Sequence, residues 1–238
     1  MVVGAYLAAT LAKRQRRFTY RFLWLPGTIG AITWLALNES VTKRIRGGLV
    51  LSCVGDPGPF TYKRSRCGNA EIDRIAEHVL MKDDRNRIED FRPIGYDERQ
   101  YCSPGFNLPI GCFMRTPNGR FPEYHSSADN LSLVTSSSLG ESLLQLLRVI
   151  QVFEENHPYL NLNPKCEPQL GRRGLYRQMG GVKDAAAAKE MAMLWILNLS
   201  DGRHDLLDIA ERSGVPFEQI SRAADALQSS GLLEATSR

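Results

Sequence analysis

Short apolar runs alternate with helical patterns over the first half of the chain. Val3–Arg17 and Ala31–Leu37 read as helices, while Phe18–Leu25, Gly48–Val54 and Ile110–Arg115 are compact apolar runs typical of buried strands. Glycine and proline separate these runs and mark the turns between them. This order of helices and buried strands predicts an α/β fold built on a mainly parallel sheet.

Two longer segments carry apolar residues at helical spacing. Glu71–Met81 and Ser138–Asn156 each place an apolar stripe every three or four residues, and the rest of each segment is polar. Such stripes usually pack against a core. We therefore expect both helices to cover the predicted sheet.

The pattern changes near Asp184. Helices are predicted at Ala185–Leu199, at Asp205–Arg212 and from Pro216, with a glycine turn between the second and third and a short strand near Gly231. This order is typical of a winged helix or helix-turn-helix. The predicted domains are an α/β domain over residues 1–165, a linker over 166–183 and a winged helix over 184–238.

Composition indicates an ordinary globular chain of 238 residues, with 43% hydrophobic and 24% charged residues. Five cysteines, an odd number without a CxxC pair, favour reduced thiols and a cytoplasmic location. No apolar run approaches the roughly 20 residues that a membrane span needs, so no membrane association is expected. The basic cluster near the start follows the apolar stretch, which is the reverse of a signal peptide.

Charge is distributed unevenly between the two parts of the chain. The net charge is +4 overall, but residues 184–238 carry −4 and the remainder +8. The expected recognition helix, Pro216–Ser229, offers Arg222 against Glu218 and Asp225, a poor match for phosphates. DNA is therefore an unlikely partner, and contact with a protein or with another copy is favoured. A DNA-binding regulator stays open as an alternative.

The candidate metal-binding chemistry lies in two segments. Asp56 directly follows an apolar strand, where ligand sites gather in open α/β sheets, and His125 lies in the polar run FPEYHSSADN. A carboxylate and an imidazole suit zinc, although a catalytic zinc takes three protein ligands. The alternatives are a turn aspartate and a loop histidine without a role.

The loop GYDERQYCSP supplies further polar groups. Asp97 and Glu98 are candidate catalytic carboxylates, since a carboxylate near an activated water can act as a base. Tyr96, Arg99 and Tyr124 are candidates for substrate binding. The alternative for this loop is a salt-bridged surface segment.

Several longer runs carry a resemblance to a known family. GYDERQYCSPGFNLP, PKCEPQLGRRGLYR and WILNLSDGRHDLLDIAERSG resemble uncharacterised aminopeptidase-like proteins that end in a winged helix and are associated with polysaccharide biosynthesis. Over essentially the whole chain, the sequence is similar to the C-terminal half of a zinc aminopeptidase followed by that winged helix. The resemblance implies a three-layer α/β/α fold, zinc as cofactor and a peptide or amino-acyl substrate. It places metal ligands at Asp56 and His125.

Two departures from the zinc aminopeptidases limit that expectation. No histidine precedes His78, and Pro26-Gly27-Thr28, where strand-end acids are expected, has no carboxylate. We therefore expect a domain without its N-terminal half and with little or no peptidase activity as it stands. The alternative is a non-catalytic assembly protein, homo-oligomeric or bound to another protein, or a regulator that uses its winged helix.

Overall fold

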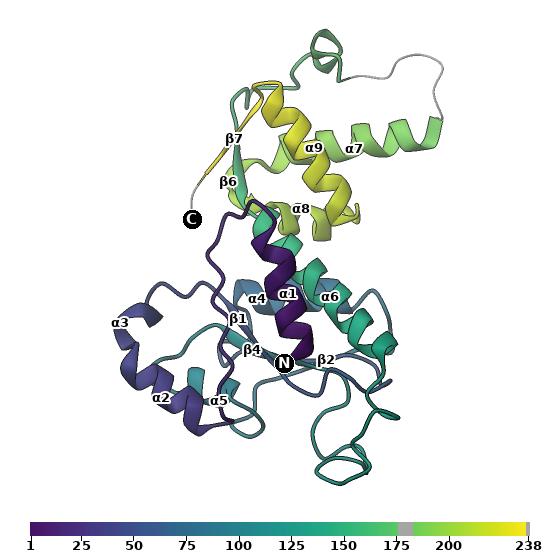
Figure 1. Ribbon diagram of the computed structural model, residues 1–238. Coiled ribbons are helices and arrows are strands. Elements are labelled where there is room, and N and C mark those ends of the chain that lie inside the picture. The colour runs from purple at the N-terminus through teal and green to yellow at the C-terminus, as the bar shows by residue number, and fades with distance from the viewer. Residues whose placement is uncertain (176–182, 237–238) are drawn as a thin grey trace. The chain divides into compact units, whose positions relative to one another are not determined.

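The computed structural model describes residues 1–175 and 183–236, with side chains left aside over 183–186. The chain divides into two compact units, residues 1–154 and 155–238 (Figure 1). The first unit contains helices α1 (Val2–Ala12), α2 (Ile29–Leu37), α3 (Glu39–Thr42), α4 (Glu71–Leu80), α5 (Glu98–Tyr101) and α6 (Ser136–Glu155), and strands β1 (Gly48–Leu51), β2 (Thr61–Lys63), β3 (Arg87–Glu89) and β4 (Ile110–Met114).

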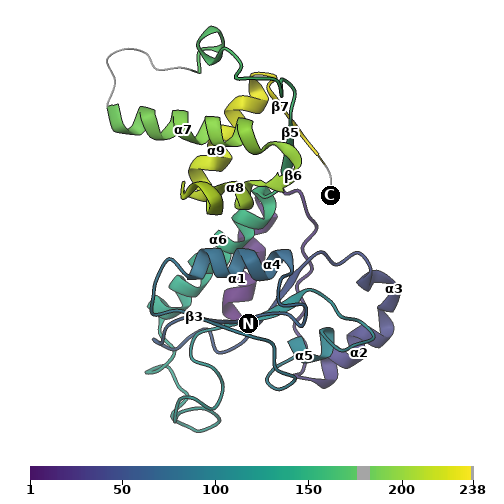
Figure 2. The ribbon, with the colours of Figure 1, turned by 180° about the vertical axis from the view of Figure 1, so that it is seen from behind.

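The sheet of the first unit has the order β1-β4-β2-β3. β1 is parallel to β4 and β2 is parallel to β3, whereas β2 and β4 are antiparallel. Helices α1, α4 and α6 lie on one side of the sheet and α2 and α5 on the other (Figures 1 and 2). The predicted α/β class with helices on both faces is confirmed, and the sheet is mixed because β2 reverses direction.

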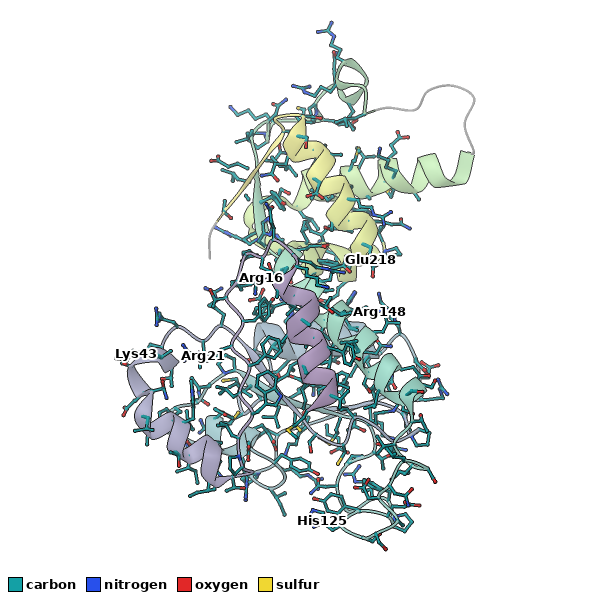
Figure 3. All side chains as sticks on the ribbon, in the orientation of Figure 1. Arg16, Arg21, Lys43, His125, Arg148 and Glu218 are labelled. Atoms are coloured by element: carbon teal, nitrogen blue, oxygen red, sulfur yellow. The ribbon has the colours of Figure 1, made fainter. Side chains whose placement is uncertain are left out.

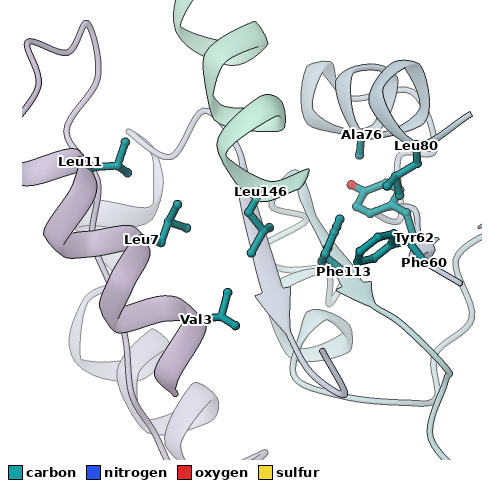
Figure 4. Close-up of a cluster of buried hydrophobic side chains, with 9 residues drawn as sticks. All are labelled: Val3, Leu7, Leu11, Phe60, Tyr62, Ala76, Leu80, Phe113 and Leu146. Carbon is teal, nitrogen blue, oxygen red and sulfur yellow. The ribbon is translucent and has the colours of Figure 1, made fainter. Parts of the chain in front are cut away.

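Two apolar clusters hold these layers together. The larger joins α1, α4 and α6 to the sheet through residues that share near-complete burial (Figure 4): Val3, Leu7, Leu11, Phe60, Tyr62, Ala76, Leu80, Phe113 and Leu146. The smaller lies on the opposite face, where Ala31 and Leu35 of α2 meet Tyr101 of α5 and Ile110 of β4. The stripes read from the sequence therefore face the sheet, as expected for amphipathic helices.

The strand predicted at Phe18–Leu25 is wrong. This segment has no regular secondary structure and pairs with no strand in the described part of the chain. Apolar composition and alternation favour an extended backbone, but a strand also needs a hydrogen-bonded neighbour. None of the strands in residues 1–175 and 183–236 provides that neighbour.

The second unit combines helices with a small antiparallel sheet. Its elements are β5 (Pro158–Asn161), the 3-10 helix η1 (Leu170–Arg173), α7 (Lys183–Leu199), β6 (Asp201–Asp205), α8 (Leu206–Ser213), α9 (Phe217–Ser229) and β7 (Leu233–Ala235). The sheet order is β6-β5-β7. Gly214, with φ +69°, ends α8 in the left-handed conformation that glycine adopts readily. The three helices with a glycine turn follow the sequence prediction.

The predicted linker, residues 166–183, is described only in part, since residues 176–182 lie outside the described residues. β5 lies in the second unit, although the sequence pattern placed residues up to 165 in the first domain. All five cysteines are free within the described chain. Among the described helices, none has both the length and the apolar character to cross a membrane.

Candidate functional site

Asp56 lies just beyond the carboxyl end of β1 and ties that strand end to the end of β4. Its Oδ1 accepts hydrogen bonds from Gly58 N at 2.9 Å and from Thr116 Oγ1 at 2.6 Å. Its Oδ2 receives only a long bond, 3.3 Å from Thr116 N. The side chain is buried, and the two short bonds to Oδ1 fix its orientation. Oδ2 retains lone pairs for a further ligand.

His125 lies in the loop between β4 and α6 (Figure 3). The residue is exposed and has φ +58°, and its ring stacks on Tyr124 with 4.1 Å between centroids. Within the described chain, no hydrogen bond reaches its ring nitrogens. Both nitrogens are therefore available to a ligand.

A short chain of polar contacts links three loops. The Tyr96 hydroxyl lies 3.0 Å from Cys53 Sγ and 3.3 Å from the Tyr124 hydroxyl. Burial, and next the hydrogen bond with Cys53, raise the pKa of Tyr96 above its ordinary value, so its phenol stays protonated at neutral pH. Tyr96 and Tyr124, two of the predicted substrate-binding residues, are therefore in contact. The His125 ring stacks on Tyr124 and so lies next to this pair.

Sequence reasoning missed Cys53 in this arrangement. Cys53 has φ +45°, a left-handed conformation rarely adopted by a residue with a side chain, and it follows β1 three residues before Asp56. The one indication in the sequence was the position of Cys53, between an apolar run and the turn that contains Asp56. Contact with a tyrosine 43 residues away was not readable from spacing.

Asp97 fixes a strained turn. Its Oδ1 accepts a hydrogen bond from Thr28 N at 2.6 Å. Thr28 has φ 62° and ψ −66°, and Ile29 N donates to Gly27 O at 2.7 Å, which closes a γ-turn of the strained kind. The loop carboxylate therefore holds the segment where the resemblance leads one to expect acidic side chains.

Glu98 is enclosed rather than presented to a cleft. Its side chain is fully buried and forms an ion pair with Lys63, which is itself buried in β2. Lys63 Nζ also donates to Ile94 O at 2.6 Å. These contacts give Asp97 and Glu98 structural partners, and their catalytic role stays a prediction.

Arg99 contributes an unsatisfied donor. Its Nε is buried and has no hydrogen-bond partner among the described residues, although the residue as a whole is only half-buried. A buried N–H of this kind usually finds a water or ligand oxygen. This is compatible with the predicted substrate-binding role.

A cavity of about 370 Å³ lies beside the Asp56 turn. Gly58, Phe60, Arg115 and Glu141 are among its lining residues. The Arg115 guanidinium lies over the Phe60 ring at 4.4 Å and bonds Gly58 O and Glu141, so its charge is already matched. The cavity is polar and is linked to Asp56 through Gly58.

Zinc does not fit the described residues as a complete site. No group of three or more histidine, cysteine, aspartate or glutamate side chains converges within residues 1–175 and 183–236 in a way that could hold a metal. A catalytic zinc takes three protein ligands and a water. Asp56 and His125 offer suitable donor atoms, but the described chain does not complete a zinc site around them.

Comparison with known proteins identifies relatives of both units. A domain of unknown function, DUF4910, matches residues 1–156, and a winged helix-turn-helix matches residues 157–235. Over 230 residues the chain is 51% identical to a provisionally named polysaccharide biosynthesis protein with aminopeptidase-like domain from Clostridium acetobutylicum, covering 96% of this chain and 52% of the relative. The chain thus spans about half the length of this curated relative. The family resemblance and the winged helix predicted from the sequence are confirmed.

Solved structures agree with this assignment. A crystal structure of a provisionally named peptidase from Clostridium acetobutylicum matches with TM-score 0.89 and 48% identity, over 98% of this chain and 52% of that one. A zinc aminopeptidase from Bacillus subtilis matches with TM-score 0.52 and 15% identity, over 63% of this chain and 39% of that one. The second likeness shows the fold alone. The first unit is therefore aminopeptidase-like in structure.

Proposed function

Since the chain belongs to the DUF4910 family and carries a winged helix-turn-helix, we propose that its first unit is part of a metal-dependent, aminopeptidase-like hydrolase. The observation that carries the proposal is Asp56, which is oriented through Oδ1 and keeps Oδ2 for a ligand at the end of a parallel strand. Ligand sites in open α/β sheets gather at such strand ends. His125 would add an imidazole from the loop that follows β4, the strand paired with β1.

The remaining donors would come from polypeptide outside the described residues. The relatives are about twice as long as this chain, so they contain further segments that could supply them. We propose a peptide or amino-acyl substrate, toward which Tyr96 and Tyr124 would present hydroxyl groups and Arg99 its unsatisfied N–H.

Metal content tests this proposal. The chain would be co-expressed with the half of the Clostridium relative that it does not match, and zinc would be measured by elemental analysis of the purified complex. We expect about one zinc or more per complex, lost in Asp56→Asn and His125→Ala. His204→Ala, in the second unit, is the matched control. Full zinc binding by the chain alone, or zinc unaffected by both site variants, would contradict the proposal.

For the second unit we propose a protein-contact role rather than DNA recognition. On α9, Arg222 is exposed and so is the opposing Asp225. Specific DNA binding rests on several Lys or Arg contacts with phosphates, so one cation beside an acid provides little affinity. We expect no salt-dependent binding to duplex DNA by fluorescence anisotropy. Binding in 150 mM salt that weakens in Arg222→Ala would refute this role.

A further inference from the structure

The segment Phe18–Leu25 connects α1 to α2, bends at Phe18 and belongs to no helix or strand of the described chain. Tyr20 and Phe22 pack against the larger core cluster, while the alternating Arg21 and Leu23 are exposed. This two-residue period is that of a strand with one face on a core. Side-chain packing, rather than a ladder of backbone hydrogen bonds, holds the segment in place.

The backbone of this segment is open along both edges. Glu154 accepts hydrogen bonds from the Phe18 amide and the Tyr20 hydroxyl, which fix the start of the segment. From Thr19 to Leu25, no backbone N–H or C=O is hydrogen-bonded to another described residue. Successive amides of an extended chain point to opposite edges, so each edge offers a row of free donors and acceptors. Such a row is a template for an added strand.

The sheet beside it is also open. β1 is an edge strand, since β4 is its only partner among the described strands. Leu49 and Leu51 of β1 pack against the same core cluster as Tyr20 and Phe22. An edge strand and an unpaired extended segment therefore share one hydrophobic core.

Apolar side chains continue from the segment onto its neighbours. Trp24 is 50% exposed, and its Nε1 would lie 3.7 Å from a Cβ built at Gly4 of α1. Leu25 lies against the first turn of α2, where Ile29 and Ile32 are exposed. Exposed apolar side chains gathered on neighbouring segments in this way often mark an interface.

Charge indicates what kind of partner fits. Arg14, Arg16 and Arg21 are exposed, and none has a hydrogen bond or ion pair with an acidic residue in the described chain (Figure 3 marks two of them). A partner with acidic groups beside apolar ones would complement this surface. The relatives contain about as much further polypeptide as this chain matches, which provides a source for it.

We propose that Phe18–Leu25 is a docking strand for a β-strand of polypeptide related to the half of the relatives that this chain does not match. The added strand would pair with the free backbone of this docking strand and cover Leu23, Trp24 and Ile29. This inference rests on the proposed function only in that the same polypeptide would bring the missing metal donors. Its test measures association, so that either proposal can fail without the other.

Proline substitutions test the pairing directly. Leu23→Pro and Trp24→Pro each remove one amide, on opposite edges, and neither amide has a bond to lose in the unpaired protein. The chain would be titrated with the unmatched half of the Clostridium relative by isothermal titration calorimetry. We expect at least one proline variant to weaken binding about tenfold more than Leu23→Ala or Trp24→Ala, equivalent to about 1.4 kcal/mol.

Hydrogen exchange keeps the test decisive if a proline variant unfolds. In the unmodified protein, the amides from Thr19 to Leu25 should exchange quickly, and addition of the fragment should protect them. Arg21→Glu should weaken binding, whereas Arg92→Glu, an exposed arginine elsewhere, should not. No binding, unchanged exchange in the complex, or protection by self-association without the fragment would each overturn the proposal.

Discussion

Removing one member of the Lys63–Glu98 ion pair should destabilise the first unit severely. Glu98 is fully buried and Lys63 is 6% exposed. Glu98→Gln would leave the Lys63 ammonium buried without an opposing charge, and breaking a buried pair in this way costs about 3–5 kcal/mol. Because Lys63 keeps its bond to Ile94 O at 2.6 Å, we expect the lower end of that range.

Replacing both members should restore most of the lost stability. Buried ion pairs exchanged for well-packed apolar side chains of similar volume are often neutral or stabilising by about 1–4 kcal/mol. Lys63→Met with Glu98→Leu should therefore unfold close to the parent protein. The two single substitutions would then be strongly non-additive, as expected for side chains in contact.

Urea unfolding monitored by tryptophan fluorescence measures these values. In a Trp195→Phe background the remaining tryptophans, Trp24 and Trp34, both report on the first unit. A cost of about 1 kcal/mol or less for Glu98→Gln is typical of an exposed pair and would refute the reasoning. A double variant that loses the sum of the single losses would refute it equally.

Three further predictions concern other contacts. Gly111→Ala should destabilise the first unit by about 1–3 kcal/mol or more in thermal unfolding, because the new Cβ would lie 2.1 Å from Tyr62 Oη. Tyr20→Phe should cost about 1–2 kcal/mol, measured the same way, through loss of its 2.7 Å bond to the carboxylate near the end of α6. The backbone amide of Arg203 is the largest cause that lowers the pKa of Asp201 to about 2. The stability that this carboxylate contributes above about pH 4 should fall as the pH drops toward 2, and Asp201→Asn should flatten that part of the pH profile.

Hydrophobic periodicity correctly predicted the helices and strands whose structure depends mainly on their own residues. The helix expected at Glu71–Met81 and the strand expected at Ile110–Arg115 lie within one residue of α4 and β4. Phe18–Leu25 has an equally apolar sequence, but pairing depends on a neighbour that its own residues do not specify. β2 was missed because it is only three residues long and ends in a buried lysine, Lys63.

Asp56 was singled out from its position after an apolar run. Its contacts in the turn fit the turn-residue alternative and its weakly bonded Oδ2 fits the ligand alternative, so its metal-binding role stays a prediction. The partners of Tyr96 and Glu98 could not be read from sequence, since Cys53 and Lys63 are each more than thirty residues away. Long-range contacts of this kind are set by the fold.

Glu154 determines how the chain can be divided for experiments. It is the last residue of the first unit, yet its carboxylate holds the Phe18 amide and the Tyr20 hydroxyl, more than 130 residues earlier. A fragment of the first unit that stops short of Glu154 would release the start of the docking strand as well as the last turn of α6. A fragment or fusion designed from the first unit should therefore retain Glu154. Proteolytic cleavage at this residue should loosen the segment that begins at Phe18.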